Sequence, residues 1–278
     1  MKELISRGIN IYHSGGITAI KRGVKSFINS GEARYKLLGV LPYTAYTLRL
    51  YIRLGNELFP SRYTDADPFK ILWIDPSKVT ESTDTARYQL RRFGKVRGGN
   101  WDQRTDTIAE DVVYQSFKER FQKNRSWKDT EYYTNIQSRI ENNKHTRAGY
   151  SISALDDYFA EFDDLYTKIE SDGYQTQQSL EASDPETTRV KNMDAPVPQM
   201  NEIGVCIGRN GNLLHSYRGK HRLMIGKIAN VDSVAVQVLT RHQEWQSVRD
   251  TIRYSKSSTL DDEAVERYQH HPDLNDIL

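Results

Sequence analysis

Cysteine is almost absent from this chain. Its 278 residues include a single cysteine, Cys206, so no disulfide can form within the chain. The thiol lies in the apolar run Gly204–Ile207, and a buried cysteine packs as a small hydrophobic side chain rather than reacting. Because disulfides are common outside the cell and rare in the cytosol, we expect a cytoplasmic protein in a reducing environment.

Long hydrophobic runs are absent as well. The best candidate for a membrane segment, Leu37–Leu48, has twelve residues and contains Pro42. A helix needs about 20 apolar residues to cross a bilayer, so this run is too short. Near the N-terminus, Arg7, Lys21 and Arg22 interrupt the apolar clusters, and no secretory signal is predicted.

A large net charge is also missing, because the whole chain carries only +2. The charge is unevenly placed. Residues 1–62 hold ten Lys and Arg against three Glu, about +7, which leaves about −5 on the remainder. Two amphipathic helices are predicted in this basic segment, over residues 17–28 and 43–54. The second places one apolar stripe at Tyr43, Tyr46, Leu50 and Leu54.

Three interpretations of the basic segment 1–62 stay open. Its helices can pack on the main domain with a solvated basic face, bind an anionic membrane surface, or contact nucleic acid. A second basic stretch, Arg91–Arg97, also has the composition of a loop that holds a phosphate or a nucleic-acid strand. Peripheral membrane attachment and homo-oligomer formation are both left open.

The clearest helix is predicted over residues 151–173. Ser151 or Ser153 can cap its start, Gly173 stops it, and apolar residues recur at i, i+3, i+4 and i+7. Its acidic residues fall on the solvated face, and the two adjacent histidines near the C-terminus have no helical partner. No metal site is therefore predicted at either place. Another helix is expected over residues 105–123.

Strands are predicted at Phe69–Pro76, Gly204–Ile207 and Val234–Leu239, where short apolar runs end in turn residues. Strands separated by helices indicate an α/β (α+β) chain.

A glycine turn followed by three basic residues, Gly219, Lys220, His221 and Arg222, opens a short helix between two of these strands. The N–H groups at a helix start lack helical partners and carry partial positive charge, so they attract anions. Arg can hold a phosphate through two parallel hydrogen bonds, and Lys adds a full charge. Taken alone, the four residues also fit a plain strand-to-helix turn with solvated basic side chains.

Three segments in this order resemble the ParB/sulfiredoxin-like family: Ile71–Glu81, Leu165–Gln177 and Ile203–Leu239. In that family a strand with an I-x-P turn leads to a helix of the form L-x-x-S-I-x-x-x-G. A strand hairpin then leads to a G-x-[HR]-R helix start. The residues that match these two boxes are Leu165, Ile169, Gly173, Gly219, His221 and Arg222.

The resemblance implies a small mixed sheet with flanking helices, covering roughly residues 69–78 and 155–240, with a helical insertion at about 84–150. The expected organisation is a basic helical arm, the ParB/sulfiredoxin-like domain, and a C-terminal helix with a tail. These parts span residues 1–62, 63–245 and 246–278.

The resemblance also implies a bound nucleotide, a nucleoside triphosphate or diphosphate with Mg²⁺, at Gly219, Lys220, His221 and Arg222. Arg241, which leaves the last strand, is expected to line the same pocket. Sulfiredoxin has a cysteine directly before its His-Arg pair, and Lys220 stands there instead, so that chemistry is excluded. The G-H-H-R form of free-serine kinases is the closest variant, and partition-type ParB proteins, which bind CTP and DNA, have G-E-R-R.

Two glutamates are candidates for the general base of a phosphotransferase. Glu81 follows the first strand, and Glu202 stands at the start of the hairpin. Such a base must reach the acceptor hydroxyl beside the phosphate. Both glutamates also fit ordinary surface acids. Three functions stay open: a nucleotide-binding protein, a small-molecule phosphotransferase, and a DNA-associated ParB-like protein.

Overall fold

A computed structural model describes most of the chain after the basic N-terminal stretch. The described residues are 44–83, 93–142, 146, 148, 151–183, 197–216, 218–254 and 267–278. The predicted helix over residues 17–28 lies outside them, as do Arg91 and Arg92 of the basic loop.

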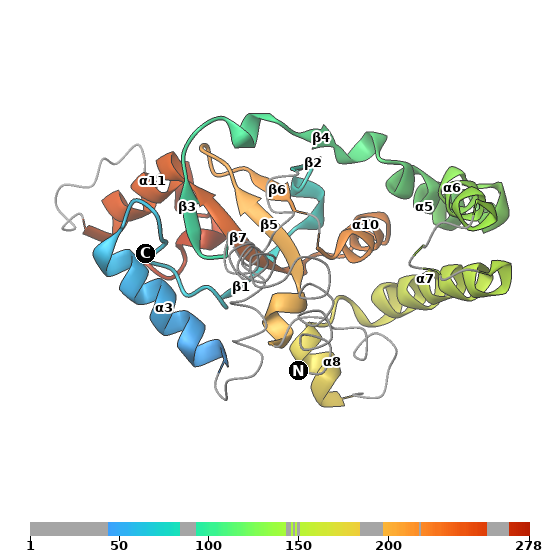
Figure 1. The fold of residues 1–278 in the computed structure, drawn as a ribbon, viewed down its shortest axis with the longest axis horizontal. Coiled ribbons are helices and arrows are strands. Elements are labelled where there is room, and N and C mark those ends of the chain that lie inside the picture. The colour runs from blue at the N-terminus through green and yellow to red at the C-terminus, as the bar shows by residue number, and fades with distance from the viewer. Residues whose placement is uncertain are drawn as a thin grey trace, which may run out of the picture.

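Within these described ranges, seven strands form one mixed sheet (Figure 1). The order is β1-β7-β5-β6-β2-β4, and β3 pairs with β7 beside β1. The predicted α/β class is confirmed. The strands are β1 (Ile71–Ile74), β2 (Glu81–Ser82), β3 (Lys95–Arg97), β4 (Asp106–Thr107), β5 (Ile203–Ile207), β6 (Leu213–His215) and β7 (Val234–His242).

Strand β7 is the centre of the sheet and is buried along its whole length. β5 runs parallel to it, with Ile203 opposite Val236 and Ile207 opposite Arg241. On the other edge of β7, β1 pairs antiparallel with the first half and β3 pairs parallel with the end. The strand continues past the predicted Val234–Leu239 because its last, polar residues find partners inside the protein.

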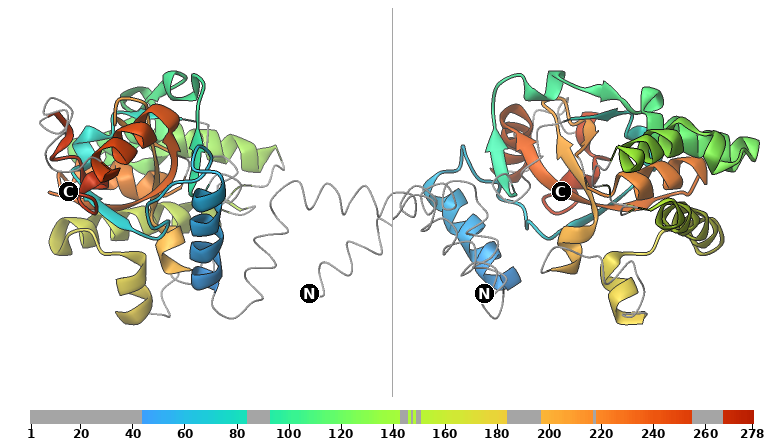
Figure 2. Two further views of the ribbon diagram at one scale, coloured as in Figure 1. Left: turned by 90° about the vertical axis from the view of Figure 1, so that its left-hand side faces the viewer. Right: turned by 45° about the vertical axis from the view of Figure 1, so that its right-hand side comes forward.

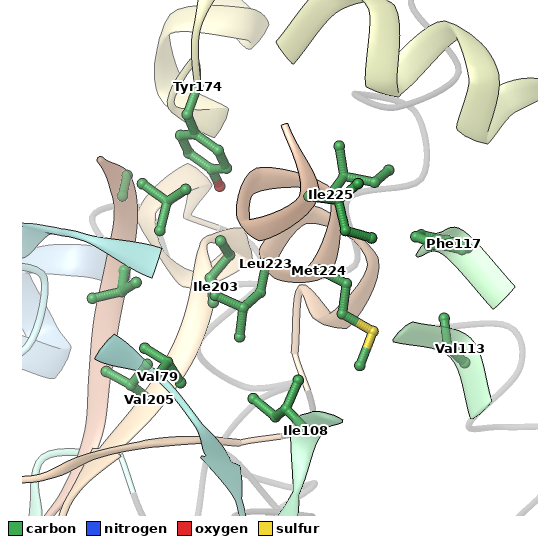
Figure 3. Close-up of a cluster of buried hydrophobic side chains, with 14 of the residues drawn as sticks. Val79, Ile108, Val113, Phe117, Tyr174, Ile203, Val205, Leu223, Met224 and Ile225 are labelled. Atoms are coloured by element: carbon green, nitrogen blue, oxygen red, sulfur yellow. The ribbon is translucent and has the colours of Figure 1, made fainter. Parts of the chain in front are cut away.

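Four helices gather on one side of the sheet (Figure 1). They are α5 (Val112–Lys123), α6 (Glu131–Glu141), α7 (Ile152–Asp172) and α10 (Lys220–Ile228). The prediction for α7 is confirmed: Ser151 caps it through Ala154 N–H, and Gly173 follows its last turn with φ +74°. Figure 3 shows a cluster of buried hydrophobic side chains, in which Leu223 of α10 lies beside Ile203 of β5 and Met224 lies on the side of Val113 and Ile108.

Helix α5 begins later than the predicted span of 105–123. Asp106 and Thr107 pair with β2 as strand β4, and a 3₁₀ turn over Ile108–Glu110 follows. Asp111 then caps α5 by accepting the N–H of Val113 at 2.9 Å. The apolar spacing predicted the helix, but the side-chain cap decided where it starts.

Helix α3 (Thr44–Leu58) lies at the periphery of the fold (Figure 2). It buries Leu48 and Ile52 in a second core cluster with Phe69 of the loop before β1 and Cys206 of β5. The buried thiol was predicted and is confirmed. The apolar stripe predicted for this helix, however, does not form its buried face: Tyr46, Leu50 and Leu54 are exposed.

The C-terminal residues form part of the core instead of the predicted tail. α11 (Gln243–Tyr254) packs behind β7, and a 3₁₀ turn over Pro272–Leu274 buries Asp273 and Leu274 completely. The carboxylate of Asp273 binds Arg241 of β7, and this charge pairing holds the chain end in place. Helix α8 (Gln177–Ser183) and further 3₁₀ turns complete the fold, at Pro76–Lys78, Trp101–Gln103, Trp127–Asp129 and Pro198–Asn201.

Among the described helices, none has both the length and the apolar character needed to cross a membrane.

Candidate functional site

The turn before α10 is built on a glycine that no other residue can easily replace. Gly219 has φ +71°, in the left-handed region, and a Cβ there would lie 2.8 Å from the Cα of Ile203. The helix then starts at Lys220 as predicted, with no side-chain cap and no acidic residue in its first turn. No residue of the first turn of α10 therefore neutralises the partial positive charge at the start of this helix.

The ammonium of Lys220 lies 2.5 Å from the carboxylate of Asp111. Asp111 also caps α5, so the starts of α5 and α10 meet at this one carboxylate. About a third of the Lys220 side chain is exposed, and about a quarter of Asp111, as their relative exposures of 36% and 26% show. Ion pairs that solvent reaches are weak, and they can exchange partners.

The imidazole of His221 turns into the helical layer. Its ring centroid lies 4.6 Å from Phe162 of α7 and 5.7 Å from Phe117 of α5. Its Nε2 is 3.1 Å from the hydroxyl of Tyr132. The contacts of this side chain tie α10 to the neighbouring helices, which is a packing role.

Arg222 and Glu202, both predicted as site residues, form a buried ion pair. Their closest atoms, Nη1 and Oε2, are 3.5 Å apart, with side-chain exposures of only 14% and 1%. The hydroxyl of Tyr174 donates to Oε2 of Glu202 at 2.8 Å and accepts from Arg222 Nη1 at 3.1 Å. Oε1 of Glu202 accepts the N–H of Gln177. Because both oxygens of Glu202 are engaged, this carboxylate is poorly placed to act as a general base.

Glu81, the other candidate base, lies elsewhere on the sheet. It stands opposite Leu214 of β6, is partly buried, and accepts a hydrogen bond from Thr105 at 2.7 Å. Glu202 instead precedes the first residue of β5. The two carboxylates are thus not brought together, and of the two only Glu81 is not paired with a buried arginine.

Arg241 is not brought to the turn either. It pairs with Ile207 at the far end of β5, whereas Gly219 packs against Ile203 at the near end. Its guanidinium is buried in contact with Asp273. The predicted site residues are therefore divided between two ends of the central strands.

His215, which sequence reasoning missed, is a buried neighbour of the turn. Its Nε2 lies 3.1 Å from the carbonyl of Arg218, so this nitrogen carries the proton of a neutral ring. Burial, aided by the charge of Lys220, lowers the pKa of His215 to about 4. Neither Asp111 nor His215 carries a motif of its own. His215 ends β6 just before the turn, and the packing of the α5 start against α10 brings Asp111 to Lys220.

The neutral state of His215 predicts a pH dependence of stability. The unfolded chain takes up this proton near its ordinary pKa of about 6.5, and the folded protein resists it down to about 4. Stability is therefore full above pH 6.5 and falls as the pH is lowered. Between about pH 7 and about pH 5 we expect a loss of roughly 2 kcal/mol from this group.

Urea unfolding of the wild type and of His215→Gln at both pH values measures this loss. His271, whose pKa burial also lowers, adds a change of the same sign in both proteins. The difference between the two proteins therefore isolates His215. An equal pH dependence in wild type and variant would contradict the prediction.

The basic stretch Arg91–Arg97 is described only from residue 93. Lys95 of β3 lies over the ring of Tyr63 at 3.2 Å, and Arg97 lies 5.9 Å from the ring of Trp101. These cations thus pack on aromatic side chains of the same chain.

Metal ligands are not grouped in the described residues, where no three His, Cys, Asp or Glu side chains come together to hold an ion. Comparison with protein-family models, with curated proteins and with solved structures finds no match for this chain. The resemblance to the ParB/sulfiredoxin-like family thus rests on the sequence motifs, and the nucleotide with Mg²⁺ stays a prediction.

Proposed function

We propose that this protein binds the phosphate of a nucleotide at the start of α10. The observation that carries the proposal is the first turn of that helix. It begins at a left-handed glycine, has neither a side-chain cap nor an acid, and opens with the partly exposed Lys220. Such a helix start favours an anion through its dipole and its N–H groups.

Lys220 is the cation that an incoming phosphate would engage. Its present partner, Asp111, is partly exposed, so the phosphate can replace it without breaking a buried contact. Arg222 is different, because Glu202 and Tyr174 hold its guanidinium inside the protein. We assign Arg222 and His221 to positioning the turn and Lys220 to contacting the ligand.

Replacing Lys220 by glutamine tests this assignment. The variant removes one charge-assisted contact, and we expect the affinity for the ligand to fall about tenfold or more. Calorimetry with ATP, ADP, CTP, GTP and inorganic phosphate, each with Mg²⁺, gives the affinities. Lys128→Gln is the matched control, because Lys128, in the 3₁₀ turn before α6, is also ion-paired, to Asp156 of α7. Unchanged affinity in Lys220→Gln would refute the proposal.

Replacing Asp111 by asparagine should have the opposite effect. Asparagine keeps the cap of α5 but removes the negative charge that competes with the phosphate for Lys220. We expect the affinity to rise about fivefold, the value of one screened charge interaction at contact distance. Unchanged binding in this variant would show that the ligand lies elsewhere, and weaker binding would show that Asp111 does not compete with the ligand for Lys220.

A further inference from the structure

The outer face of α3 carries a continuous apolar stripe. Tyr46, Leu50, Leu54 and Leu58 follow one another at intervals of four residues, so they share one side of the helix. Their relative exposures are 65%, 44%, 52% and 70%. Phe59, directly after the helix, is 53% exposed and extends the stripe. Isolated exposed apolar residues are ordinary, but a row of this kind marks an interaction surface.

The helix is held firmly with this face outward. Leu48 and Ile52 fill the second core cluster on its inner side. Gly55 lies against the ring of Tyr63 so closely that a Cβ would meet the ring at 2.7 Å. The hydroxyls of Tyr51 and Tyr63 are 2.7 Å apart. Because the inner face is fixed by these contacts, the helix cannot rotate to bury its outer stripe.

The charges around the stripe indicate what covers it. α3 carries Arg49 and Arg53 against one acid, Glu57, and its first turn has no acidic residue. Arg49 is bound to Asp67, whereas Arg53 is exposed. The sequence before the helix, residues 1–43, holds seven Lys and Arg against two Glu. An apolar stripe beside the exposed Arg53, on a helix that directly follows a basic segment of the chain, suits an anionic partner that also offers an apolar phase.

A lipid bilayer with anionic head groups offers both. A helix that lies in the plane of the membrane buries its apolar face at the acyl boundary, and basic side chains bind the head groups. A second copy of the chain fits less well. A stable interface needs about 20–30 residues a side, far more than the five of this stripe. Packing the α3 helices of two copies against each other would also bring their arginines, Arg49 and Arg53, close together, and like charges repel.

We propose that the outer face of α3 is a docking surface for an anionic membrane, with Tyr46, Leu50, Leu54 and Leu58 in the interface. Arg53 binds the head groups beside them. The proposal does not depend on the phosphate site at α10, which lies on a different part of the fold (Figure 1).

Vesicle co-sedimentation of the full-length protein tests the proposal. The vesicles contain phosphatidylcholine alone or mixed with phosphatidylglycerol. We expect the wild type to bind the mixed vesicles only. The affinity of the double variant Leu50→Ser/Leu54→Ser for these vesicles should be reduced about tenfold or more. Both positions are exposed, so the variant should fold and melt like the wild type. Ile152→Ser/Tyr254→Ser, which removes two exposed apolar residues elsewhere, is the matched control and should bind normally.

A fluorescent probe reports insertion directly. Cys206 is buried, so a cysteine introduced as Leu54→Cys can be labelled selectively with an environment-sensitive dye. Dye emission should rise on mixed vesicles and not on phosphatidylcholine alone. Equal binding of wild type and Leu50→Ser/Leu54→Ser would overturn the proposal, because the basic residues alone would then explain attachment. Absence of wild-type binding would overturn it too. A dimer in light scattering that Leu50→Ser/Leu54→Ser dissociates would assign the stripe to a second copy.

Discussion

Replacing Asp273 by alanine is expected to lower the free energy of unfolding by about 3–5 kcal/mol, the cost of leaving a buried charge without its partner. The carboxylate is fully buried and receives both hydrogen bonds of Arg241 and the indole N–H of Trp245 at 2.9 Å. Arg249, also fully buried, lies 3.4 Å away. Burial raises the pKa of Asp273, but the two guanidinium groups outweigh it and hold the pKa below its usual value.

The matched control is Asp276→Ala, three residues further on. Asp276 also pairs with Arg249 and with Lys70, but a third of its side chain is exposed. Partly exposed ion pairs contribute about 1 kcal/mol or less, so this variant should remain close to the wild type. Urea unfolding of both variants measures the difference. An equal loss of unfolding free energy in the two variants would show that burial does not make the ion pairs of Asp273 stronger than those of Asp276.

Arg222→Met is expected to cost about 3 kcal/mol or more, because it leaves Glu202 buried without its cation. The methionine fills most of the volume, so the loss reports charge rather than a cavity. Ligand binding to this variant is a poor test of the phosphate site, since any loss would mix local unfolding with a lost contact. For this reason Lys220 is the better position for that test.

The double variant Arg222→Met/Glu202→Gln separates the two effects. Glutamine keeps a polar group for Tyr174 and Gln177 without the unpaired charge, so part of the lost stability should return. Chemical denaturation of both single variants and the double variant gives the coupling free energy. If the stability losses of the two single variants add up to the loss of the double variant, the coupling free energy is zero and the ion pair itself does not contribute to stability.

Local patterns in the sequence predicted local structure well. The long helix α7 was predicted with its cap and its stop, because apolar spacing, Ser151 and Gly173 all act within a few residues. The start of α10 at Gly219 was predicted for the same reason. α3 shows where such patterns fail: both of its faces are apolar, so spacing alone could not tell which one the core would cover.

The partners of the charged side chains were beyond the reach of such patterns. Lys220 binds Asp111, and Arg222 binds Glu202, which a motif of four residues cannot indicate. Arg241 was assigned to the same pocket because it leaves the last strand, yet its partner is Asp273 near the end of the chain. These pairings follow from strand order and helix packing, which bring distant residues together.

The sequence by itself determined the α/β class, the helices α7 and α10, the buried Cys206 and the chemical character of the turn at Gly219, because each depends on spacing or on one residue's backbone freedom. Only the tertiary structure decided which cations are buried in ion pairs, which remain exchangeable, and which face of α3 meets solvent. The physical reason is that burial and electrostatic pairing depend on what packs against a residue, and most of those neighbours lie far away along the chain.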